Sequence, residues 1–187
     1  MATPRSAAPA ERWAALVLAA GVGARLGGMV KPLIKIDGQP LICRLVQQLQ
    51  SAGMGPIALV LAAHGKPIRA ALQQLGPLNT QPLRFVDVAP GHDQMHSLQQ
   101  GLRSLAHDEC NVMVCLSDQA LIGASAIAAL MRAHQQRPEG TDMVVPWVQQ
   151  RPGHPVTLSR RLVQEWAQAN VQQIGKTWRE AHPERVQ

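Results

Sequence analysis

Residues 14–33 read AALVLAAGVGARLGGMVKPL, a run of aliphatic residues that passes into glycines, Arg25 and Lys31. The continuously apolar segment 13–19 is typical of a strand that is covered on both faces of a parallel sheet. The glycines after it allow backbone N–H groups to approach phosphate oxygens closely. A guanidinium and an ammonium group beside them would neutralise phosphate charge that backbone amides alone cannot. This stretch predicts a buried first strand and a loop that binds a nucleoside triphosphate.

The glycine spacing in this loop does not match two familiar phosphate-binding patterns. The dinucleotide pattern GxGxxG requires a third glycine three residues after the second, but the next glycine after Gly23 is Gly27. The P-loop pattern GxxxxGK[ST] fails because this loop contains no Gly-Lys-hydroxyl triplet. A plain strand-to-helix turn that carries two solvated cations is therefore the alternative interpretation.

Beyond the loop, apolar runs alternate with segments of helical periodicity. Further strands are predicted at 57–63, 83–88, 111–118, 142–148 and 153–159. Helices are predicted at 41–53, 66–75, 93–106 and 124–136, and the residues after 159 are predicted to be largely helical. This order predicts an α/β fold, a doubly wound, mostly parallel, Rossmann-like sheet with helices on both faces. Ligands of such sheets bind beyond the carboxyl ends of the strands.

The composition bounds the class of protein. The chain has 187 residues, which fits one domain, predicted at 12–187 after a disordered lead-in at 1–11. Aromatic residues make up only 3%, so a nucleic-acid platform built on stacked aromatics is not expected. The net charge of +6 is scattered along the chain and favours a small anionic substrate over nucleic acid.

The cysteines and the N-terminus indicate a compartment. Cys43, Cys110 and Cys115 show no CxxC spacing and are expected to be buried thiols in a reducing environment. A zinc site of Cys110, Cys115 and His107 is the weaker alternative. The apolar run at 13–19 is short and follows an acid-base pair, so a strand explains it better than a signal peptide. No segment reaches the length of a membrane span, and a cytoplasmic location is expected.

Three segments together resemble a known family. LAAGVGARLGGMVKPL resembles the signature of nucleotidyltransferases that join an NTP to a phosphorylated acceptor. VMVCLSDQALI and MVVPWVQQRPGHPVTLS resemble the L-x-D-Q-P and P…G-H-P-V segments of the MobA-like NTP transferase family, whose members include molybdenum cofactor cytidylyltransferases and guanylyltransferases. The resemblance runs from residue 13 to 159 and implies the nucleotide-diphospho-sugar transferase type of α/β fold.

This resemblance implies a reaction. A nucleoside monophosphate would pass from an NTP to molybdopterin or the molybdenum cofactor, with Mg²⁺ bound and pyrophosphate released. Ala20 favours CTP, because the guanylyl branch tends to carry glycine there. The residues expected to bind nucleotide are Leu18, Ala19, Ala20, Gly21, Gly23, Arg25 and Lys31. Arg25, Lys31 and Asp118 are expected to be catalytic.

Asp118 follows the apolar run VMVCL, where a strand-end acid would face the ligand crevice. Mg²⁺ prefers hard oxygen ligands, and one or two carboxylates with phosphate oxygens are typical. The alternative is that Asp118 caps the next helix. The resemblance assigns Asp118 as the Mg²⁺ ligand.

Two other segments bear candidate substrate contacts. His92 and His96 have metal-ligand spacing without an evident third ligand, and more simply begin a helix that Asp93 caps. The resemblance places this segment against nucleotide or acceptor, although Asp93 stands where relatives have glycine; the matching residues are Ser97, Leu98, Gly101 and Leu102. His154 is either a turn histidine or, by the resemblance, a hydrogen-bond donor in the acceptor pocket, so Ser97 and His154 are the expected acceptor contacts.

The end of the chain departs from the family pattern. Relatives close with a strand and a D-x-D element that adds carboxylates to the metal site, whereas this sequence ends in HPERVQ, so that strand is expected to be missing. Two other functions stay open. One is a sugar- or alcohol-phosphate nucleotidyltransferase, and the other is a non-catalytic nucleotide- or pterin-binding partner of a molybdoenzyme. A molybdoenzyme or its chaperone is the expected protein partner.

Overall fold

The computed structural model describes residues 11–21, 30–75, 83–91, 93–119 and 122–187. Gly23, Arg25 and His92 lie outside these ranges, as does nearly all of the expected lead-in at 1–11.

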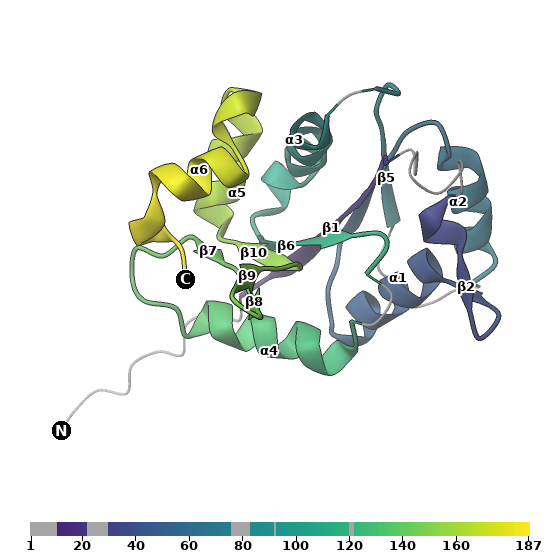
Figure 1. Ribbon diagram of the computed structural model, residues 1–187, viewed down its shortest axis with the longest axis horizontal. Coiled ribbons are helices and arrows are strands. Elements are labelled where there is room, and N and C mark those ends of the chain that lie inside the picture. Colours follow the sequence, from purple (N-terminus) through teal and green to yellow (C-terminus); the bar gives the residue numbers. More distant parts are fainter. Residues whose placement is uncertain (1–10, 22–29, 76–82, 92, 120–121) are drawn as a thin grey trace.

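A mostly parallel sheet lies at the centre of the described chain (Figure 1), with strands in the order β5-β4-β1-β6-β10-β7. The bounds of these strands are β1 Trp13–Ala19, β4 Ile57–Leu61, β5 Leu83–Asp87, β6 Asn111–Leu116, β7 Met143–Val144 and β10 Val156–Leu158. β1 pairs in parallel with β4 and β6, β5 pairs in parallel with β4, and β10 runs antiparallel between β6 and β7. Val186 adds a parallel bridge to Met143 at the β7 edge. The predicted α/β fold with a mostly parallel sheet is confirmed.

Helices cover both faces of the sheet, as predicted (Figure 1). The α-helices are α1 Leu41–Ser51, α2 Gly65–Gln73, α3 Gln94–Leu105, α4 Ala124–Gln135, α5 Arg160–Gln168 and α6 Lys176–Ala181. Short 3-10 helices are η2 Lys31–Leu33, η3 Ala106–Asp108, η4 Val171–Gln173 and η5 Pro183–Arg185. α3, α5 and α6 contribute to the hydrophobic core on one face, and α1, α2 and α4 to the core on the other.

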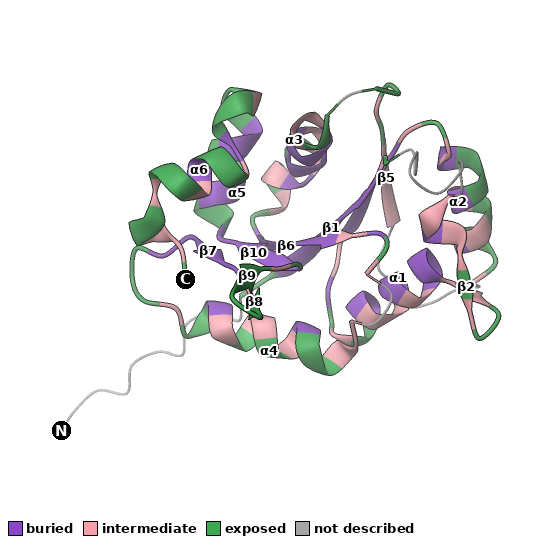
Figure 2. Cartoon of the chain, viewed as in Figure 1, coloured by how far each residue is buried: buried purple, intermediate pink, exposed green. Residues whose placement is uncertain are grey.

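The side chains of β1 explain why its sequence is apolar throughout. Ala14, Leu16 and Leu18 pack on the α3 side, and Ala15 and Val17 pack on the α1 side. Figure 2 shows the result: the central strands are buried, while the helices bury one face and expose the other. A strand covered on both faces has no solvent side and therefore no polar alternation.

Gly101 sets the distance between α3 and the sheet. A Cβ at this position would lie 2.3 Å from Cδ1 of Leu16 and 2.8 Å from Cγ2 of Val60. A helix glycine costs about 1 kcal/mol relative to alanine, so close packing is the physical reason for it here. The close approach brings the start of α3 to the end of β1.

The expected strand at 142–148 is wrong as a single element. β7 ends at Val144, and Pro146, which has no N–H for a ladder, separates it from β8 (Trp147–Val148). β8 pairs with β9 (Arg151–Pro152) in an antiparallel hairpin outside the main sheet. A second hairpin pairs β2 (Lys35–Ile36) with β3 (Gln39–Pro40).

The remaining sequence predictions concern cysteines, metals and membranes. Cys43, Cys110 and Cys115 are buried free thiols, as predicted, and burial raises the pKa of Cys110 to about 11 and of Cys115 to about 12. Among the described residues no three His, Cys, Asp or Glu side chains gather where they could hold a metal, so the zinc alternative has no support. None of the helices in the described ranges is long and apolar enough to cross a bilayer.

Candidate active site

A cavity of about 290 Å³, here called cavity I, lies at the carboxyl ends of β1 and β6. This is the edge where ligands of parallel α/β sheets bind. Leu18 pairs with Leu116 in the parallel register, so the segments that follow the two strands meet across the cavity. Its lining residues are Leu18, Ala20, Gly21, Lys31, Pro32, Gln94, Ser97, Leu116, Ser117 and Asp118.

The two charged side chains of cavity I face each other loosely. Nζ of Lys31, at the start of η2, lies 3.5 Å from Oδ2 of Asp118 in the turn after β6. The side chains are 39% and 43% exposed, so water screens the contact and the ion pair adds little to stability. Both groups are therefore available to a ligand that enters the cavity.

The structure excludes one of the two interpretations of Asp118. The N-cap of α4 is Gly123, and the first amide of that helix, on Ala124, donates instead to Oε1 of Gln48 at 2.8 Å. Asp118 does not cap α4, so the capping alternative is wrong. Its carboxylate lines cavity I at the end of β6.

The predicted cap of α3 is confirmed. Oδ1 of Asp93 accepts a hydrogen bond of 2.7 Å from the backbone N–H of His96. This cap begins the helix at Gln94, and the first turn then places Gln94 and Ser97 against cavity I. The metal pair proposed for His92 and His96 lies partly outside the described residues.

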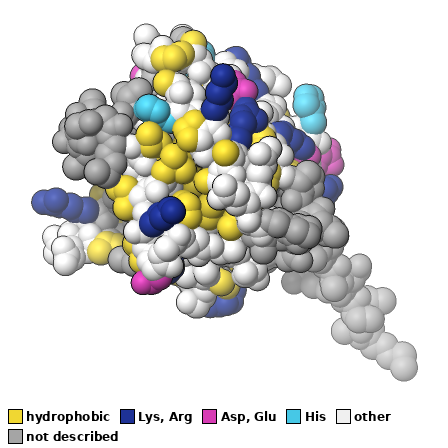
Figure 3. All heavy atoms as spheres, turned by 90° about the vertical axis from the view of Figure 1, so that its right-hand side faces the viewer, with side chains coloured by type: hydrophobic (Ala, Val, Ile, Leu, Met, Phe, Trp, Pro, Cys, Tyr) yellow, Lys and Arg dark blue, Asp and Glu magenta, His cyan; other side chains and the backbone are white. Residues whose placement is uncertain are grey.

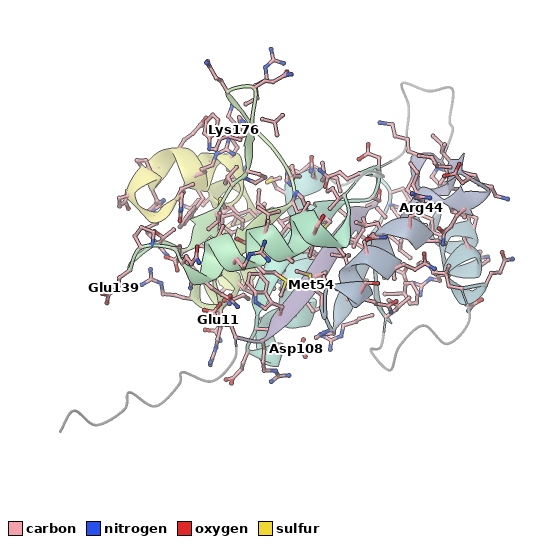
Figure 4. All side chains as sticks on the ribbon, turned by 90° about the horizontal axis from the view of Figure 1, so that it is seen from below. Glu11, Arg44, Met54, Asp108, Glu139 and Lys176 are labelled. Carbon is pink, nitrogen blue, oxygen red and sulfur yellow. The ribbon has the colours of Figure 1, made fainter. Side chains whose placement is uncertain are left out.

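A second cavity of about 270 Å³, here called cavity II, adjoins cavity I and shares Leu18 and Gln94 with it. Its floor is apolar and is lined by Leu18, Met95, Leu98, Val114, Met143, Val156 and Trp166. Its polar rim contains Gln94, His154, Lys176 and Arg179. Figure 4 shows Lys176 on the side of the molecule opposite Glu11 and Asp108, which precede β1 and β6 at their amino ends.

His154 lies on the segment between β9 and β10 and lines cavity II. Displacement of water by the surrounding protein lowers the pKa of the imidazole, the nearby Arg179 charge acts in the same direction, and a hydrogen bond with the Val114 backbone opposes them. A pKa below the ordinary value leaves the ring neutral at pH 7. His154 can then offer a hydrogen bond to a ligand but no positive charge.

Gln119 connects the two cavities; it is the glutamine of the segment that resembles L-x-D-Q-P, but it was not among the predicted site residues. Its Oε1 accepts from the Leu116 backbone N–H at 3.1 Å, and its Nε2 donates to the His154 carbonyl at 2.9 Å. One amide thereby ties the turn that carries Asp118 to the segment that carries His154. Because the partners are 35 residues apart, no local pattern signals this contact.

The predicted site residues do not all meet. Cavity I contains Leu18, Ala20, Gly21, Lys31, Ser97 and Asp118, and cavity II contains His154. The side chain of Ala19 packs in the core on the α1 side and lines neither cavity. Gly23 and Arg25 lie outside the described residues. Gln94, Lys176 and Arg179 line the cavities without having been predicted.

The donor set of cavity I fits a hard divalent cation only with help from a ligand. Asp118 is the one carboxylate that lines this cavity in the described part of the chain. Mg²⁺ is commonly held by one or two carboxylates together with substrate phosphates and water. The residues present therefore fit a cation shared between Asp118 and the phosphates of a bound nucleotide.

On the face that bears α2 and β2, the basic side chains of the described residues do not form one continuous patch for an anionic partner (Figure 3). Figure 3, which faces the side that bears α2 and β2, shows Lys and Arg interspersed with hydrophobic and acidic side chains. The mixed pattern agrees with the scattered charge of the sequence.

Known proteins match this chain along most of its length. A family model described as a MobA-like NTP transferase domain matches residues 15–186. The crystal structure of Rv0371c from Mycobacterium tuberculosis H37Rv is similar, with a TM-score of 0.73 at 22% identity over 95% of this chain and 86% of that one. Another crystal structure of Rv0371c, described as a complex with manganese, has a TM-score of 0.66 at 19% identity over 94% and 86%.

Two further relatives also match this chain. A 4-diphosphocytidyl-2C-methyl-D-erythritol synthase from Anaerococcus prevotii has a TM-score of 0.67 at 13% identity over 95% of this chain and 86% of that one. The bifunctional protein GlmU of Bartonella quintana is 26% identical over 134 residues, which are 70% of this chain and 28% of that protein. The matched region spans little more than a quarter of GlmU. The structural likenesses, all below 25% identity, show a shared fold.

Proposed function

The chain belongs to the MobA-like NTP transferase family, and we propose that it transfers CMP from CTP to a molybdopterin-type acceptor and releases pyrophosphate. The observation that carries this proposal is the pair of adjoining cavities. Cavity I has the charges that suit a triphosphate, and cavity II has an apolar floor with a polar rim. Leu18 and Gln94 lie where the two ligands would meet.

The reaction requires positioning and charge neutralisation more than covalent chemistry from the protein. An oxygen of the acceptor phosphate attacks the α-phosphorus of the nucleotide. The bond from that phosphorus to the oxygen shared with the β-phosphorus breaks, and pyrophosphate leaves with the electron pair. Lys31 lies where its ammonium group would stabilise the charge that develops on the leaving group.

Asp118 is the residue that would hold a divalent cation. When bound, Mg²⁺ reduces the repulsion between the α-phosphate and its anionic attacker. The manganese complex described for Rv0371c supports a divalent cation in this fold. Arg25 would add a second cation to the triphosphate, as the resemblance implies.

The choice of CTP rests on Ala20 and on the family branch. Ala20 lines cavity I, and the guanylyl branch tends to carry glycine at this position. The diphosphocytidyl product named for the Anaerococcus relative also supports a cytidine nucleotide. A molybdoenzyme or its chaperone would receive the product.

A sugar- or alcohol-phosphate acceptor is the second candidate, because the name of the Anaerococcus relative contains methylerythritol, an alcohol. The floor of cavity II argues against it. Met95, Leu98, Val114 and Trp166 offer apolar surface to a flat ring system and few partners to a polyhydroxylated sugar.

Pyrophosphate release tests the proposal. The protein is incubated with Mg²⁺ and CTP, GTP or UTP, each with molybdopterin, a sugar phosphate or an alcohol phosphate. We expect release only with CTP and molybdopterin, and a fall in turnover of about 10²–10³-fold in Lys31→Ala. Lys35→Ala, an exposed lysine of the β2–β3 hairpin, is the matched control and should retain turnover. Full turnover by Lys31→Ala would refute the role given to the ammonium group, and binding without turnover would favour a non-catalytic partner.

A further inference from the structure

Arg179 differs from the other half-buried arginines that the structure describes. Each of the others has a carboxylate within ion-pair distance; they are Arg44, Arg69, Arg84, Arg137 and Arg185. Arg179 is half-buried as well, yet no carboxylate or carbonyl of the described residues pairs with its guanidinium. A charge that loses part of its hydration without a partner is unfavourable, so this position favours an anion from outside the chain.

The surroundings of Arg179 are those of a binding site. Arg179 follows Lys176 by three residues on α6, which places the two side chains on one face of the helix. Both line cavity II with His154. Lys176 has an ion pair with Glu180 at 3.5 Å, but these side chains are 76% and 63% exposed, so the pair is weak and leaves the ammonium group available.

Gly175 and Trp178 pack α6 against the rest of the fold, and Trp178 is 4% exposed in the core. Gly175 has φ +66°, which side chains rarely adopt, and a Cβ there would lie 2.3 Å from Sδ of Met95. The glycine therefore allows the start of α6 to approach α3 across the floor of cavity II. The position of Arg179 therefore depends on this tertiary packing.

The lining restricts the class of ligand. A guanidinium binds phosphate and carboxylate groups through two parallel hydrogen bonds, and a neighbouring ammonium group adds charge. The same cavity is also lined by Met95, Leu98, Val114 and Trp166, which suit a flat or apolar body. The two features together fit an anionic group on a ring system, and a phosphate monoester is the anion that the proposed function supplies.

We infer that Arg179, assisted by Lys176, binds the phosphate monoester of the acceptor in cavity II, apart from the charges that serve the nucleotide in cavity I. The inference rests on the proposed function in taking cavity II as the acceptor site. It adds a specificity-determining residue from α6, which lies beyond the segments that carry the family resemblance.

Phenyl phosphate is a probe with the required chemistry, since it joins an aromatic ring to a phosphate monoester. The protein is first saturated with a non-hydrolysable CTP analogue, so that cavity I is filled, and phenyl phosphate is then titrated by calorimetry. The wild-type chain should bind it, and Arg179→Gln should bind it at least tenfold more weakly with unchanged affinity for the CTP analogue. Arg132→Gln is the matched control, because Arg132 is exposed on α4 and lines neither cavity.

Arg179→Lys retains a positive charge but not the paired donors, so its affinity for phenyl phosphate should lie between those of the wild type and Arg179→Gln. Thermal melts followed by circular dichroism verify that each variant is folded. Equal phenyl phosphate binding by the wild type and a folded Arg179→Gln would overturn the inference, as would wild-type protein that does not bind the probe. A parallel loss of affinity for the CTP analogue would also overturn it, by placing Arg179 in the nucleotide site. Failure of the proposed function is distinguishable, because pyrophosphate release would then be absent while phenyl phosphate binding still depended on Arg179.

Discussion

Charged cavities lie at both edges of the same sheet and differ in how their charges are partnered. A cavity of about 480 Å³ at the amino ends of β1 and β6, here called cavity III, is larger than cavity I or cavity II. Its central carboxylate, Asp142, is 2% exposed and accepts hydrogen bonds from Ser159 at 2.5 Å, from Arg185 at 2.8 Å and from Arg161. In cavities I and II, Lys31 and Asp118 meet only loosely, and Arg179 has no described partner.

The difference teaches that the partners of a charge are more informative than the size of the cavity around it. Burial alone would raise the pKa of Asp142, but the hydrogen bonds from Arg161, Ser159 and Arg185 outweigh it and hold the pKa at about 2. The charges of cavity III therefore stabilise one another. The charges of cavities I and II are left for a ligand, which is what a binding site requires.

The largest expected effect is a loss of turnover on substitution in cavity I. Asp118→Asn removes the carboxylate that would hold the divalent cation, and we expect turnover to fall about 10³-fold while the melting temperature stays near that of the wild type. Pyrophosphate release over a Mg²⁺ titration measures it. Asp37→Asn, in the exposed β2–β3 turn, is the matched control, since asparagine tolerates the positive φ of 52° found there. An unchanged Mg²⁺ dependence in Asp118→Asn would place the cation elsewhere.

A substitution in cavity III should do the reverse and lower stability without lowering turnover. Asp142→Asn leaves Arg161 and Arg185 without their buried carboxylate, and we expect a loss of about 2 kcal/mol in the free energy of unfolding with turnover per folded molecule unchanged. Urea unfolding at pH 7 measures the first quantity. A fall in turnover of the folded variant would show that cavity III is functional and would break the comparison.

The same carboxylate predicts a pH dependence of stability. Because the folded pKa of Asp142, about 2, lies below the ordinary value of 3.8, the ionised group stabilises the fold fully above pH 4. That contribution is lost as the pH falls toward 2. The difference in unfolding free energy between the wild type and Asp142→Asn should shrink over this window, and a constant difference would contradict the assignment.

A smaller effect is expected where Gln119 joins cavities I and II. In Gln119→Glu the carboxylate still accepts a hydrogen bond from the Leu116 amide but repels the His154 carbonyl. The segment that carries His154, which lines cavity II, should therefore move. We expect KM for the acceptor to rise about tenfold, or about 1.4 kcal/mol, with KM for CTP unchanged. Gln135→Glu, exposed on α4, is the control. Equal changes in both KM values would mean that Gln119 supports the whole site and not the acceptor side.

The smallest change in unfolding free energy is expected for an exposed ion pair at cavity III. Arg160 and Glu109 form an ion pair of 2.7 Å at its rim, with side chains 51% and 59% exposed. Arg160→Gln should change the unfolding free energy by less than about 0.5 kcal/mol in the same urea experiment. A loss as large as that of Asp142→Asn would show that the number of charges, and not the burial of Asp142, stabilises this edge.

Local patterns predicted the parts of the molecule that depend on near neighbours in the sequence. The apolar run at 13–19 predicted β1 because both of its faces are covered, and Asp93 predicted the start of α3 because a cap acts within one turn. Strand ends in parallel sheets face the ligand edge, which predicted the position of Asp118, and its side chain lines cavity I there. The break in 142–148 was missed because the apolar run continues through Pro146. The lack of a backbone N–H at Pro146 matters only where a neighbouring strand would accept a hydrogen bond from it, and the sequence does not show where that is.

The sequence by itself determined the α/β order, the strand-end acid and the basic residue that faces it, since each depends on periodicity or on a motif of adjacent residues. Only the tertiary structure decided that Gln119 joins the segments of Asp118 and His154, that α6 brings Arg179 to cavity II, and that Asp142 is neutralised at the opposite edge. The physical reason is distance along the chain. Hydrogen bonds and ion pairs between residues far apart in sequence exist only after packing has brought their elements together, and no local pattern encodes which carboxylate a given arginine will meet.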